Sequence, residues 1–331
     1  MWTWLFGSRL IPQEQYTGKV VVITGCDSGF GYGTALDLVA LGFHVAAGCY
    51  TETGILDLTS TITTNPSKYS KGKLTALRLD VTSDESVAKF TSQVTAESAN
   101  NIFAVINNAG ISVGLPLEVI SMHDHKQVME VNYFGPLRII RAFSPFLRRF
   151  SLAQKMNNKN KRVYPRFITI SSISDRGAPP LLSAYATSKH AVKTLTEIAR
   201  LELGQFGIQT TVIEPYYAVT PIVVGKSAGH RRKYEEADEE VKNAYFLPPL
   251  EEMERGEKAM MTDFMSLKAQ DVVDVIVKAV RTAHVENYYL VGFMAHVIVG
   301  LYRVLPQWLI DRILLASYKD IGFHANKDKY L

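Results

Sequence analysis

The sequence predicts a single-domain α/β fold, with a seven-stranded, mostly parallel sheet, helices on both faces and a small helical lobe. Short apolar runs alternate with helical stretches, which indicates βαβ units joined by right-handed crossovers. The runs are almost continuously apolar, as in strands that are covered on both faces. The chain has 331 residues, of which 47% are hydrophobic and 21% charged, and this composition suits one large globular domain.

Seven apolar, β-branched runs are the strand candidates. They are Lys19–Thr24, His44–Cys49, Thr75–Asp80, Phe103–Asn107, Arg166–Ser171, Thr210–Glu214 and Tyr288–Val291. Residues 151–165 are polar and rich in Asn and Lys, so we expect a surface loop before the fifth strand. Residues 222–262 are charged and helix-prone, and they follow the sixth strand, where such a sheet forms its ligand crevice. We therefore interpret residues 216–262 as a lobe that covers the substrate.

The charge pattern argues against a nucleic-acid-binding protein. The formal net charge is +4, and the basic residues are scattered apart from residues 155–166 and 231–232. No stacking aromatic residues accompany these groups, so we interpret them as solvated loop surfaces. The two cysteines, Cys26 and Cys49, exclude a disulfide framework. No metal site is expected.

A glycine-rich loop follows the first strand and opens a helical pattern. It reads Thr24-Gly25-Cys26-Asp27-Ser28-Gly29-Phe30-Gly31. The first glycine permits a sharp turn, the second a close approach of the backbone to a pyrophosphate, and the third close packing of helix on strand. The N–H groups at the start of the helix then face the phosphates. A simple turn is the alternative for glycines alone, but the strand–loop–helix context predicts a dinucleotide-binding Rossmann fold.

The end of the second strand bears on the choice between the two nicotinamide cofactors. An acidic residue there binds the ribose diol, whereas an arginine accommodates the 2′-phosphate. The sequence has Cys49, Tyr50 and Glu52 at this point, with no basic residue nearby in the chain. NAD is therefore favoured, with NADP as the alternative. Asp80 and Val81, after the third strand, are expected to contact the adenine, although a strand-ending cap is an equally good interpretation.

Tyr185 and Lys189 are the candidate catalytic pair, because residues four apart on a helix share a face. A nearby ammonium stabilises a phenolate, so this tyrosine can exchange a proton with an alcohol as hydride is transferred. The spacing alone is weak evidence, since Tyr69 and Lys73 repeat it. Only Tyr185 has a serine thirteen residues upstream, Ser172, at the tip of an apolar strand. Its hydroxyl can donate to the substrate oxygen.

Asparagines mark two further points of this candidate site. The fourth strand ends in Asn107-Asn108-Ala109-Gly110, where a tight turn is expected to border the cofactor. Asn132 lies in a predicted buried helix, and a polar side chain there needs a partner. A support for proton transfer and a hydrogen-bonded packing residue are both consistent with that position.

Together these motifs resemble the short-chain dehydrogenase/reductase family over residues 18–300. The resemblance implies a catalytic set of Asn132, Ser172, Tyr185 and Lys189, in which the lysine also holds the nicotinamide ribose and the asparagine supports a proton relay. It implies further cofactor contacts at Pro215, and at Thr220, which matches the threonine that contacts the carboxamide. The sequence departs from the family pattern at Tyr216, where a glycine usually follows the proline. That change is expected to reshape the pocket unless the side chain points away.

The stretches VVITGCDSGFG and VNYFG and the hydrophobic tail are similar to those of the retinol dehydrogenase and 17β-hydroxysteroid dehydrogenase (type 6-like) subgroup. This resemblance implies oxidation of retinols or hydroxysteroids with NAD at the endoplasmic reticulum membrane. A cytoplasmic location is the alternative, because many members of the subgroup begin with a hydrophobic anchor that is longer than the apolar run at the start of this sequence.

The predicted domain plan is an N-terminal extension (1–17), a dehydrogenase domain (18–287) and a C-terminal apolar segment (288–331). Residues 288–304 are almost long enough to span a bilayer, but His296 and Arg303 interrupt them and Pro306 follows. Beyond the proline, four apolar residues share one helical face: Leu309, Ile310, Ile313 and Leu314. We expect this segment to lie on a membrane surface. Packing against the domain, or against a second subunit in a homodimer, is the alternative.

The sequence thus predicts an enzyme that interconverts an alcohol and its carbonyl on a small lipophilic substrate, a hydroxysteroid or a retinol. A reductase of another small carbonyl compound is one alternative. A non-catalytic nucleotide-binding scaffold on the same fold is another, because a fold alone does not imply an activity. A structural membrane protein would account for the tail but not for the glycine loop or the four polar residues.

Overall fold

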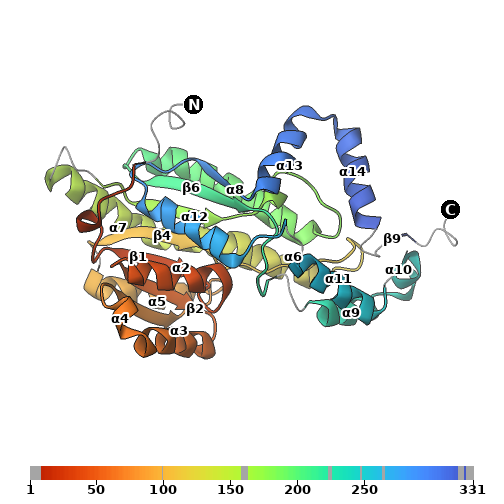
Figure 1. Cartoon of the computed structure of the whole chain (residues 1–331), viewed down its shortest axis with the longest axis horizontal. Coiled ribbons are helices and arrows are strands. Elements are labelled where there is room, and N and C mark those ends of the chain that lie inside the picture. Colours follow the sequence, from red (N-terminus) through yellow and green to blue (C-terminus); the bar gives the residue numbers. More distant parts are fainter. Residues whose placement is uncertain are drawn as a thin grey trace.

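The computed structural model describes residues 9–98, 100–157, 163–222, 226–246, 248–262, 265–319 and 324–325. These residues form one α/β domain with a lobe at one end and a helical hairpin beside it (Figure 1).

Seven strands form the central sheet, in the order β3-β2-β1-β4-β5-β6-β8, and all neighbours run parallel. The strands are β1 (Val20–Thr24), β2 (His44–Cys49), β3 (Lys73–Arg78), β4 (Ile102–Asn107), β5 (Arg166–Ile170), β6 (Gln209–Pro215) and β8 (Tyr288–Val291). All seven predicted strands are confirmed, although β3 begins and ends two residues earlier than expected. The strand order reverses between β1 and β4, and the carboxyl ends of strands diverge at such a switch to leave a ligand crevice.

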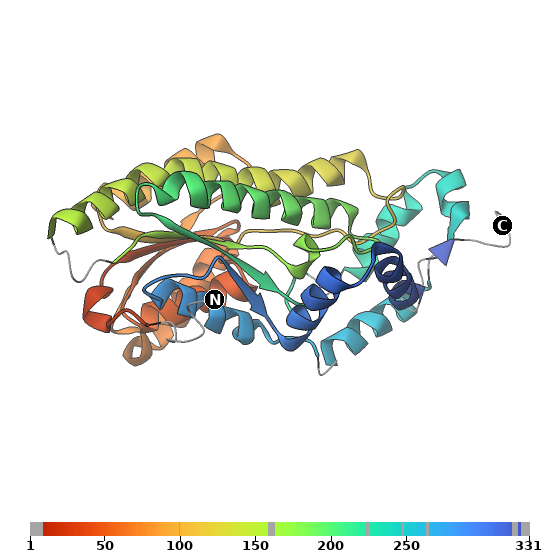
Figure 2. The ribbon, with the colours of Figure 1, turned by 90° about the horizontal axis from the view of Figure 1, so that it is seen from above.

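Helices cover both faces of the sheet (Figure 2). On one face lie α2 (Gly29–Ala40), α3 (Glu52–Thr64) and α12 (Ala269–Arg281), and on the other lie α5 (Asp84–Ser98), α7 (Gly135–Asn157) and α8 (Ser183–Gly204). Shorter elements connect them: η1 (Gln13–Gln15), α4 (Pro66–Tyr69), α6 (Met122–Met129), η2 (Glu130–Phe134) and η3 (Ile173–Asp175).

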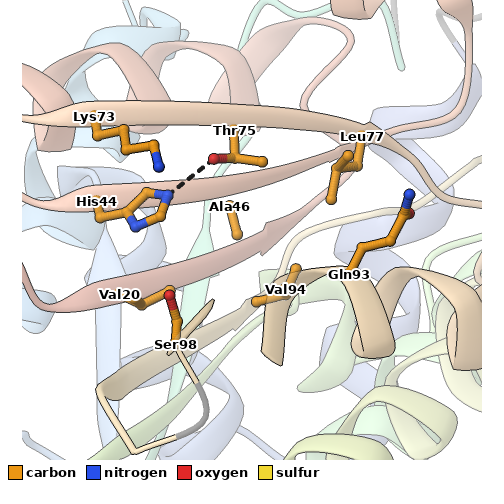
Figure 3. A pocket seen from close by; sticks show the side chains of 9 residues that line it. All are labelled: Val20, His44, Ala46, Lys73, Thr75, Leu77, Gln93, Val94 and Ser98. Carbon is orange, nitrogen blue, oxygen red and sulfur yellow. Dashed lines mark hydrogen bonds between the residues drawn. The ribbon is translucent and has the colours of Figure 1, made fainter. Parts of the chain in front are cut away.

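Packing between α5 and the amino-terminal ends of β1, β2 and β3 leaves a cavity of about 220 Å³ (Figure 3). His44 and Thr75 border it and are joined by a hydrogen bond of 2.9 Å between the ring Nε2 and the hydroxyl. This cavity lies towards the amino-terminal ends of the strands, whereas the crevice lies at their carboxyl ends. None of the predicted site residues lines it.

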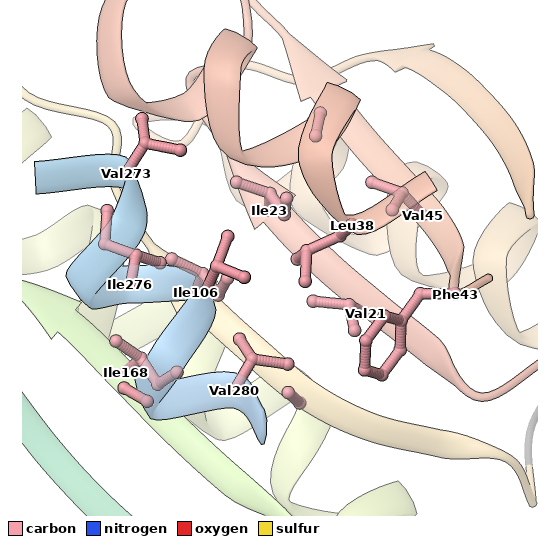
Figure 4. Packing of buried hydrophobic residues seen from close by; sticks show 14 of the residues in the cluster. Val21, Ile23, Leu38, Phe43, Val45, Ile106, Ile168, Val273, Ile276 and Val280 are labelled. Carbon is pink, nitrogen blue, oxygen red and sulfur yellow. The ribbon is translucent and has the colours of Figure 1, made fainter. Parts of the chain in front are cut away.

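The other face of the sheet is closely packed by one side of α12 (Figure 4). Ile276 and Val280 point from this helix towards Ile106 of β4 and Ile168 of β5, whereas Val273 lies against Gly33 of α2. All five of these apolar side chains are buried. Their spacing of three and four residues is that of one helical face. This packing fixes α12 against the sheet and close to α2, which begins at the glycine loop.

The predicted lobe consists of α9 (Ser227–Glu235), α10 (Glu239–Ala244), β7 (Tyr245–Phe246) and α11 (Leu250–Thr262). Its stem is held by backbone hydrogen bonds from Leu267 to Tyr217 (2.9 Å) and from Val219 to Leu267 (3.0 Å). The ion pair between Lys233 of α9 and Asp124 of α6, at 2.5 Å, joins the lobe to the body.

One loop prediction was wrong in part. Residues 151–157 continue α7 as a helix, and Ser151 within them is buried. The polar composition suggested a loop, but α7 packs along β4, and this contact supports its last turns. The rest of the predicted loop, residues 158–162, lies outside the described residues.

Both ends of the described chain contact the dehydrogenase domain. Near the N-terminus, Ile11 and Tyr16 are buried, and the Ile11 N–H donates to Arg281 at the end of α12 (2.7 Å). At the other end, the first four residues of the predicted C-terminal segment are β8, the last strand of the sheet.

A hairpin of α13 (Phe293–Val304) and α14 (Gln307–Lys319) then extends from the domain (Figure 1), and β9 (His324–Ala325) pairs with β7. The predicted apolar face of α14 is turned partly inward: Ile310 is 6% exposed, and Leu309 and Leu314 are half-buried. Trp308 and Leu315 are instead 61% and 59% exposed. Among the described residues, every helix is too short or too polar to cross a bilayer.

Candidate active site

The glycine loop turns sharply between β1 and α2 and packs closely on neighbouring backbone at two of its glycines. Gly25 has a φ of +71°, which favours glycine, and a Cβ there would lie 2.7 Å from Cα of Ala109. A Cβ at Gly31 would lie 2.3 Å from the carbonyl oxygen of Gly25. The first turn of α2 therefore packs directly on the loop, and its N–H groups face the crevice.

The end of β4 is joined to this loop by Asn108. Its side-chain amide donates to the carbonyl oxygens of Thr24 and Gly25, at 2.9 Å each, and its backbone N–H donates to the Thr24 hydroxyl at 3.0 Å. Ala109 donates to the same hydroxyl. The structure thus brings the glycine loop and the Asn108–Gly110 turn together at the switch point of the sheet.

The carboxylate of Asp27 connects the loop to the end of β2. It accepts hydrogen bonds from the N–H groups of Tyr50 and Thr51 and from the Thr51 hydroxyl, each at 2.7 Å. Glu52, on which the cofactor argument partly rested, is the first residue of α3 and does not line the crevice.

The sequence suggested that no positive charge lies near the end of β2, and the structure corrects this expectation. The guanidinium of Arg78, at the end of β3, lies 4.6 Å from the ring centroid of Tyr50. It reaches the tip of β2 from the neighbouring strand, so spacing along the sequence does not reveal it. Arg78 does not itself line the crevice.

Asp80 caps the turn after β3 and also borders the crevice. Its carboxylate accepts hydrogen bonds from the N–H (2.9 Å) and the hydroxyl (2.7 Å) of Thr82. It lines the crevice beside Val81. The two interpretations of this residue are therefore compatible.

The crevice has a volume of about 700 Å³ and holds most of the predicted cofactor residues. Those in its wall are Gly25, Asp27, Ser28, Gly29, Phe30, Asp80, Val81, Asn108, Ala109, Gly110, Tyr185, Lys189 and Thr220. The predicted residues Gly31, Cys49 and Pro215 are not in the wall, and all three are buried.

Tyr185 and Ser172 lie close together at one end of the crevice. Tyr185 lies in the first turn of α8 and lines the crevice, whereas Ser172 follows β5, caps η3 by accepting from the N–H of Ser174 at 3.2 Å, and is not in the crevice wall. The Nζ of Lys189 lies 5.5 Å from the centroid of the Tyr185 ring and donates to the carbonyl oxygen of Ile170 at 2.9 Å. The structure thus brings three of the four predicted catalytic residues together.

Burial strongly affects the protonation of this group. It raises the pKa of Tyr185 to about 12; the Ser172 hydroxyl opposes this shift and the charge of Asp175 adds to it. Burial lowers the pKa of Lys189 to about 8, and Asp175 opposes that shift. In the protein alone, the Tyr185 phenol is therefore protonated at neutral pH.

Asn132 is buried behind the crevice wall, in the π-helical turn η2. Its side chain exchanges two hydrogen bonds with the backbone of Ile111, at 2.9 Å each, and donates to the Ser188 hydroxyl at 2.9 Å. The Ser188 hydroxyl in turn donates to the carbonyl oxygen of Tyr185 (2.7 Å). Asn132 thereby connects the chain after β4 to α8.

The other Tyr-x3-Lys pair lies elsewhere. Tyr69 is buried in α4 and Lys73 begins β3, so these two residues do not share a helix or line the crevice. Tyr216 continues the sheet, because its N–H donates to Val291 of β8 at 3.0 Å, and its side chain is not in the crevice wall.

The sequence analysis missed a group of crevice residues. They are Thr51, Leu79, Thr82, Ile111, His123, Lys126, Gln127, Glu130, Val131, Ile170, Ser171, Pro221 and Ile222. Most of them neighbour a predicted residue, which is a signal that could have been used. His123, Lys126 and Gln127 of α6 carried no such signal, because only the fold brings α6 to the crevice.

Comparisons with known proteins agree with this geometry. Residues 19–230 match the short chain dehydrogenase family. The chain is 30% identical to human 17-beta-hydroxysteroid dehydrogenase type 2, over 94% of this chain and 76% of that protein. It is 32% identical to the mitochondrial D-beta-hydroxybutyrate dehydrogenase of Rattus norvegicus, over 60% of this chain and 54% of that protein.

The fold is also similar to that of a short chain dehydrogenase from Burkholderia cenocepacia in complex with NADP. The TM-score is 0.64 at 25% identity, and the match covers 90% of this chain and 98% of the other. Both the sequence and the fold therefore support one assignment: the chain belongs to the short-chain dehydrogenase/reductase family.

Proposed function

We propose that this protein interconverts an alcohol and its carbonyl compound with a nicotinamide cofactor. The observation that carries the proposal is the position of Tyr185 and Lys189 together in the wall of the crevice, with the Lys189 Nζ 5.5 Å from the centroid of the Tyr185 ring and Ser172 close enough to oppose the rise in the Tyr185 pKa. Two hydroxyl groups placed in this way can bind one substrate oxygen between them, with a cation close by.

In oxidation, the Tyr185 phenolate would accept the proton of the substrate hydroxyl while Ser172 donates a hydrogen bond to the same oxygen. Lys189 would stabilise the phenolate. Because burial raises the pKa of Tyr185 to about 12, this base form needs positive charge nearby, from Lys189 and from an oxidised nicotinamide. Asn132 would support the arrangement by holding α8 through Ser188, and would assist a proton relay.

The residues of the crevice fit a dinucleotide. Gly25, Ser28 and Gly29 line the crevice at the start of α2, where the N–H groups of a helix suit a pyrophosphate. When bound, the nicotinamide supplies the hydride acceptor or donor. NAD is proposed as the preferred cofactor, because the Asp27 carboxylate lies at the tip of β2, where a 2′-phosphate would be repelled.

A lipophilic substrate, a hydroxysteroid or a retinol, is supported by the relatives named as hydroxysteroid dehydrogenases and by the lobe. Leu115, Val119 and Ile120 form a buried apolar cluster after β4, and Tyr234 and Val241 of the lobe pack against it. The lobe thus packs apolar side chains against the loop that follows β4.

We also propose that the α13–α14 hairpin holds the protein on a membrane surface, at the endoplasmic reticulum. Phe293, Val304, Trp308 and Leu315 of the hairpin are exposed large apolar residues. Tryptophan favours the membrane interface, and such a surface needs no spanning helix. A substrate dissolved in the membrane would then be close to the enzyme.

The function is tested by screening hydroxysteroids and retinols for NADH formation by absorbance. For an accepted substrate, we expect Tyr185→Phe to lower kcat by roughly a thousandfold, since it removes the proton-transfer group. Tyr69→Phe is the matched control and should retain wild-type turnover, because Tyr69 lies outside the crevice.

A Tyr185→Phe variant that keeps wild-type turnover would contradict the proposal. Cofactor binding by a protein that turns over no alcohol or ketone would instead support the non-catalytic scaffold.

A further inference from the structure

A fully buried carboxylate, Asp175, lies directly behind the candidate catalytic residues. It ends the short helix η3, which begins after Ser172, and its side chain is completely buried. The Ser171 hydroxyl lies 2.5 Å from Oδ2 of Asp175 and 3.3 Å from the carbonyl oxygen of Lys189. One side chain therefore connects this carboxylate to the turn of α8 that carries Lys189.

The second oxygen of Asp175 faces two cations but accepts no hydrogen bond from the described residues. The Nε of Arg176 lies 3.4 Å from Oδ1, and the Nζ of Lys193 lies 3.5 Å from it. Arg176 is mainly engaged elsewhere, in a two-pronged pair with Glu214 at 2.6 and 3.1 Å. The charge of Asp175 is therefore only loosely neutralised by its own neighbours.

The charged and titratable groups around Asp175 come from five elements. They are Ser171 after β5, Arg176 after η3, Tyr185, Lys189 and Lys193 of α8, Glu214 of β6, and Tyr288 of β8, which in turn donates to Glu197 of α8. Arg176 and Lys193 balance Asp175 and Glu214, and Lys189 adds one more positive charge to this buried group.

A buried ammonium without an opposing charge loses its proton easily. Lys189 donates to a backbone carbonyl, and no carboxylate among the described residues forms an ion pair with it. The Asp175 carboxylate, one hydroxyl away from the Lys189 backbone, is the buried negative charge that acts on it. The same charge acts on the phenol of Tyr185.

We propose that Asp175 is a positioning residue for the reaction, whose carboxylate keeps the Lys189 ammonium charged and, through Ser171, holds its helical turn. This inference rests on the proposed function, in which Lys189 must be charged to stabilise the Tyr185 phenolate. It adds a role for a residue that touches neither substrate nor cofactor.

The test is the pH profile of kcat/KM for alcohol oxidation in Asp175→Asn. Removing a negative charge makes every neighbouring proton easier to lose, so both limbs should move to lower pH by about one unit. The profile is measured at saturating NAD, whose positive nicotinamide lowers the pKa of Tyr185, so that the acid limb reports Tyr185 and the alkaline limb reports Lys189. Asp175→Glu, which keeps the charge, should retain the wild-type midpoints, and so should Asp84→Asn, which removes an exposed carboxylate.

A merely structural role would lower kcat at every pH and leave the midpoints unmoved, and that result would overturn the inference. A second measurement does not depend on turnover. Difluorotyrosine in place of Tyr185 allows its ionisation to be followed by fluorine NMR in the protein with bound NAD.

We expect Asp175→Asn to lower the pKa of this residue by the same amount, and an unchanged pKa would contradict the inference. An absence of turnover in the wild type would count against the proposed function alone.

Discussion

Asp27 is the residue on which the cofactor preference depends. Its carboxylate is held by three hydrogen bonds at the tip of β2, so its charge is fixed where the two cofactors differ. Arg78 lies behind the Tyr50 ring, outside the crevice wall, with its positive charge directed to the face of that ring. The balance of these two charges, rather than Glu52, would decide between NAD and NADP.

Asp27→Asn keeps one hydrogen-bond acceptor and removes the charge. We expect the ratio of kcat/KM with NADP to that with NAD to rise by roughly tenfold, because a repulsion worth about 1.4 kcal/mol is removed. Steady-state kinetics with both cofactors measure the ratio. Asp57→Asn, on the exposed side of α3, is the control and should leave it unchanged. An unaltered ratio in Asp27→Asn would count against the preference for NAD.

The lobe is joined to the loop after β4 by a hydrogen bond that depends on the protonation state of His230. His230 of α9 accepts this hydrogen bond at its Nε2 from the N–H of Gly114, at 3.3 Å. Only an unprotonated Nε2 can accept this bond. Burial lowers the pKa of His230 from 6.5; Glu257 opposes the shift, and Lys226 and Lys233 add to it.

Because the folded-state pKa of His230 is depressed, its contribution to stability is full above 6.5 and is lost as the pH falls through the folded-state value. We therefore expect faster hydrogen exchange in α9 at about pH 5 than at about pH 8, after correction for intrinsic rates. His230→Gln should lose this pH response, since an amide oxygen can accept the bond at both values. His296→Gln, on α13, should keep the pH response. A response that persists in His230→Gln would contradict the role of the His230–Gly114 hydrogen bond.

Elements were predictable where one strong local signal determines them. The seven strands follow from apolar, β-branched runs. Strand β3 ends before Asp80, whose carboxylate caps the following turn by accepting from Thr82, one of the two interpretations that the sequence allowed. The helical turn at 151–157 was missed because polar composition describes a loop and an exposed helix equally well. Only its tertiary contacts distinguish the two.

The candidate site divides in the same way. Tyr185, Lys189 and the glycines are recognisable because their spacing is local. Arg78 and His123 are not, since each reaches the site from an element that is distant in the sequence from its neighbours there. Asp175 lies close to Ser172 in the sequence, but only the fold brings it against α8. Cys49 was expected at the cofactor because it ends β2, but its side chain points into the core.

At the scale of the whole molecule, the α13–α14 hairpin extends from one side of the domain (Figure 1). Trp308 and Leu315 are the most exposed large apolar residues of α14, while Ile310 packs inward. The inward residue stabilises the hairpin, so the outward ones are free to contact a lipid surface.

The double substitution Trp308→Glu with Leu315→Glu should reduce binding to liposomes at least about tenfold, because each buried apolar side chain contributes roughly 1.5–3 kcal/mol. Cosedimentation with phosphatidylcholine vesicles measures the bound fraction. Leu56→Glu alters an equally exposed leucine on α3 and should bind as the wild type does. Undiminished binding by the double variant would show that another surface holds the membrane.

The stem of the lobe has a consequence for how such a protein changes its specificity. The two ends of the lobe leave the sheet from β6 and return towards β8, and they are joined to each other by the bridge between Ala218 and Leu267. The segment between these residues is therefore an insertion closed at its base. Exchanging residues 220–266 for those of a relative should alter substrate choice while the sheet, the glycine loop and the Tyr185 helix fold as before. If the lobe recognises the substrate as proposed, this architecture would separate the residues that bind the substrate from those that react with it.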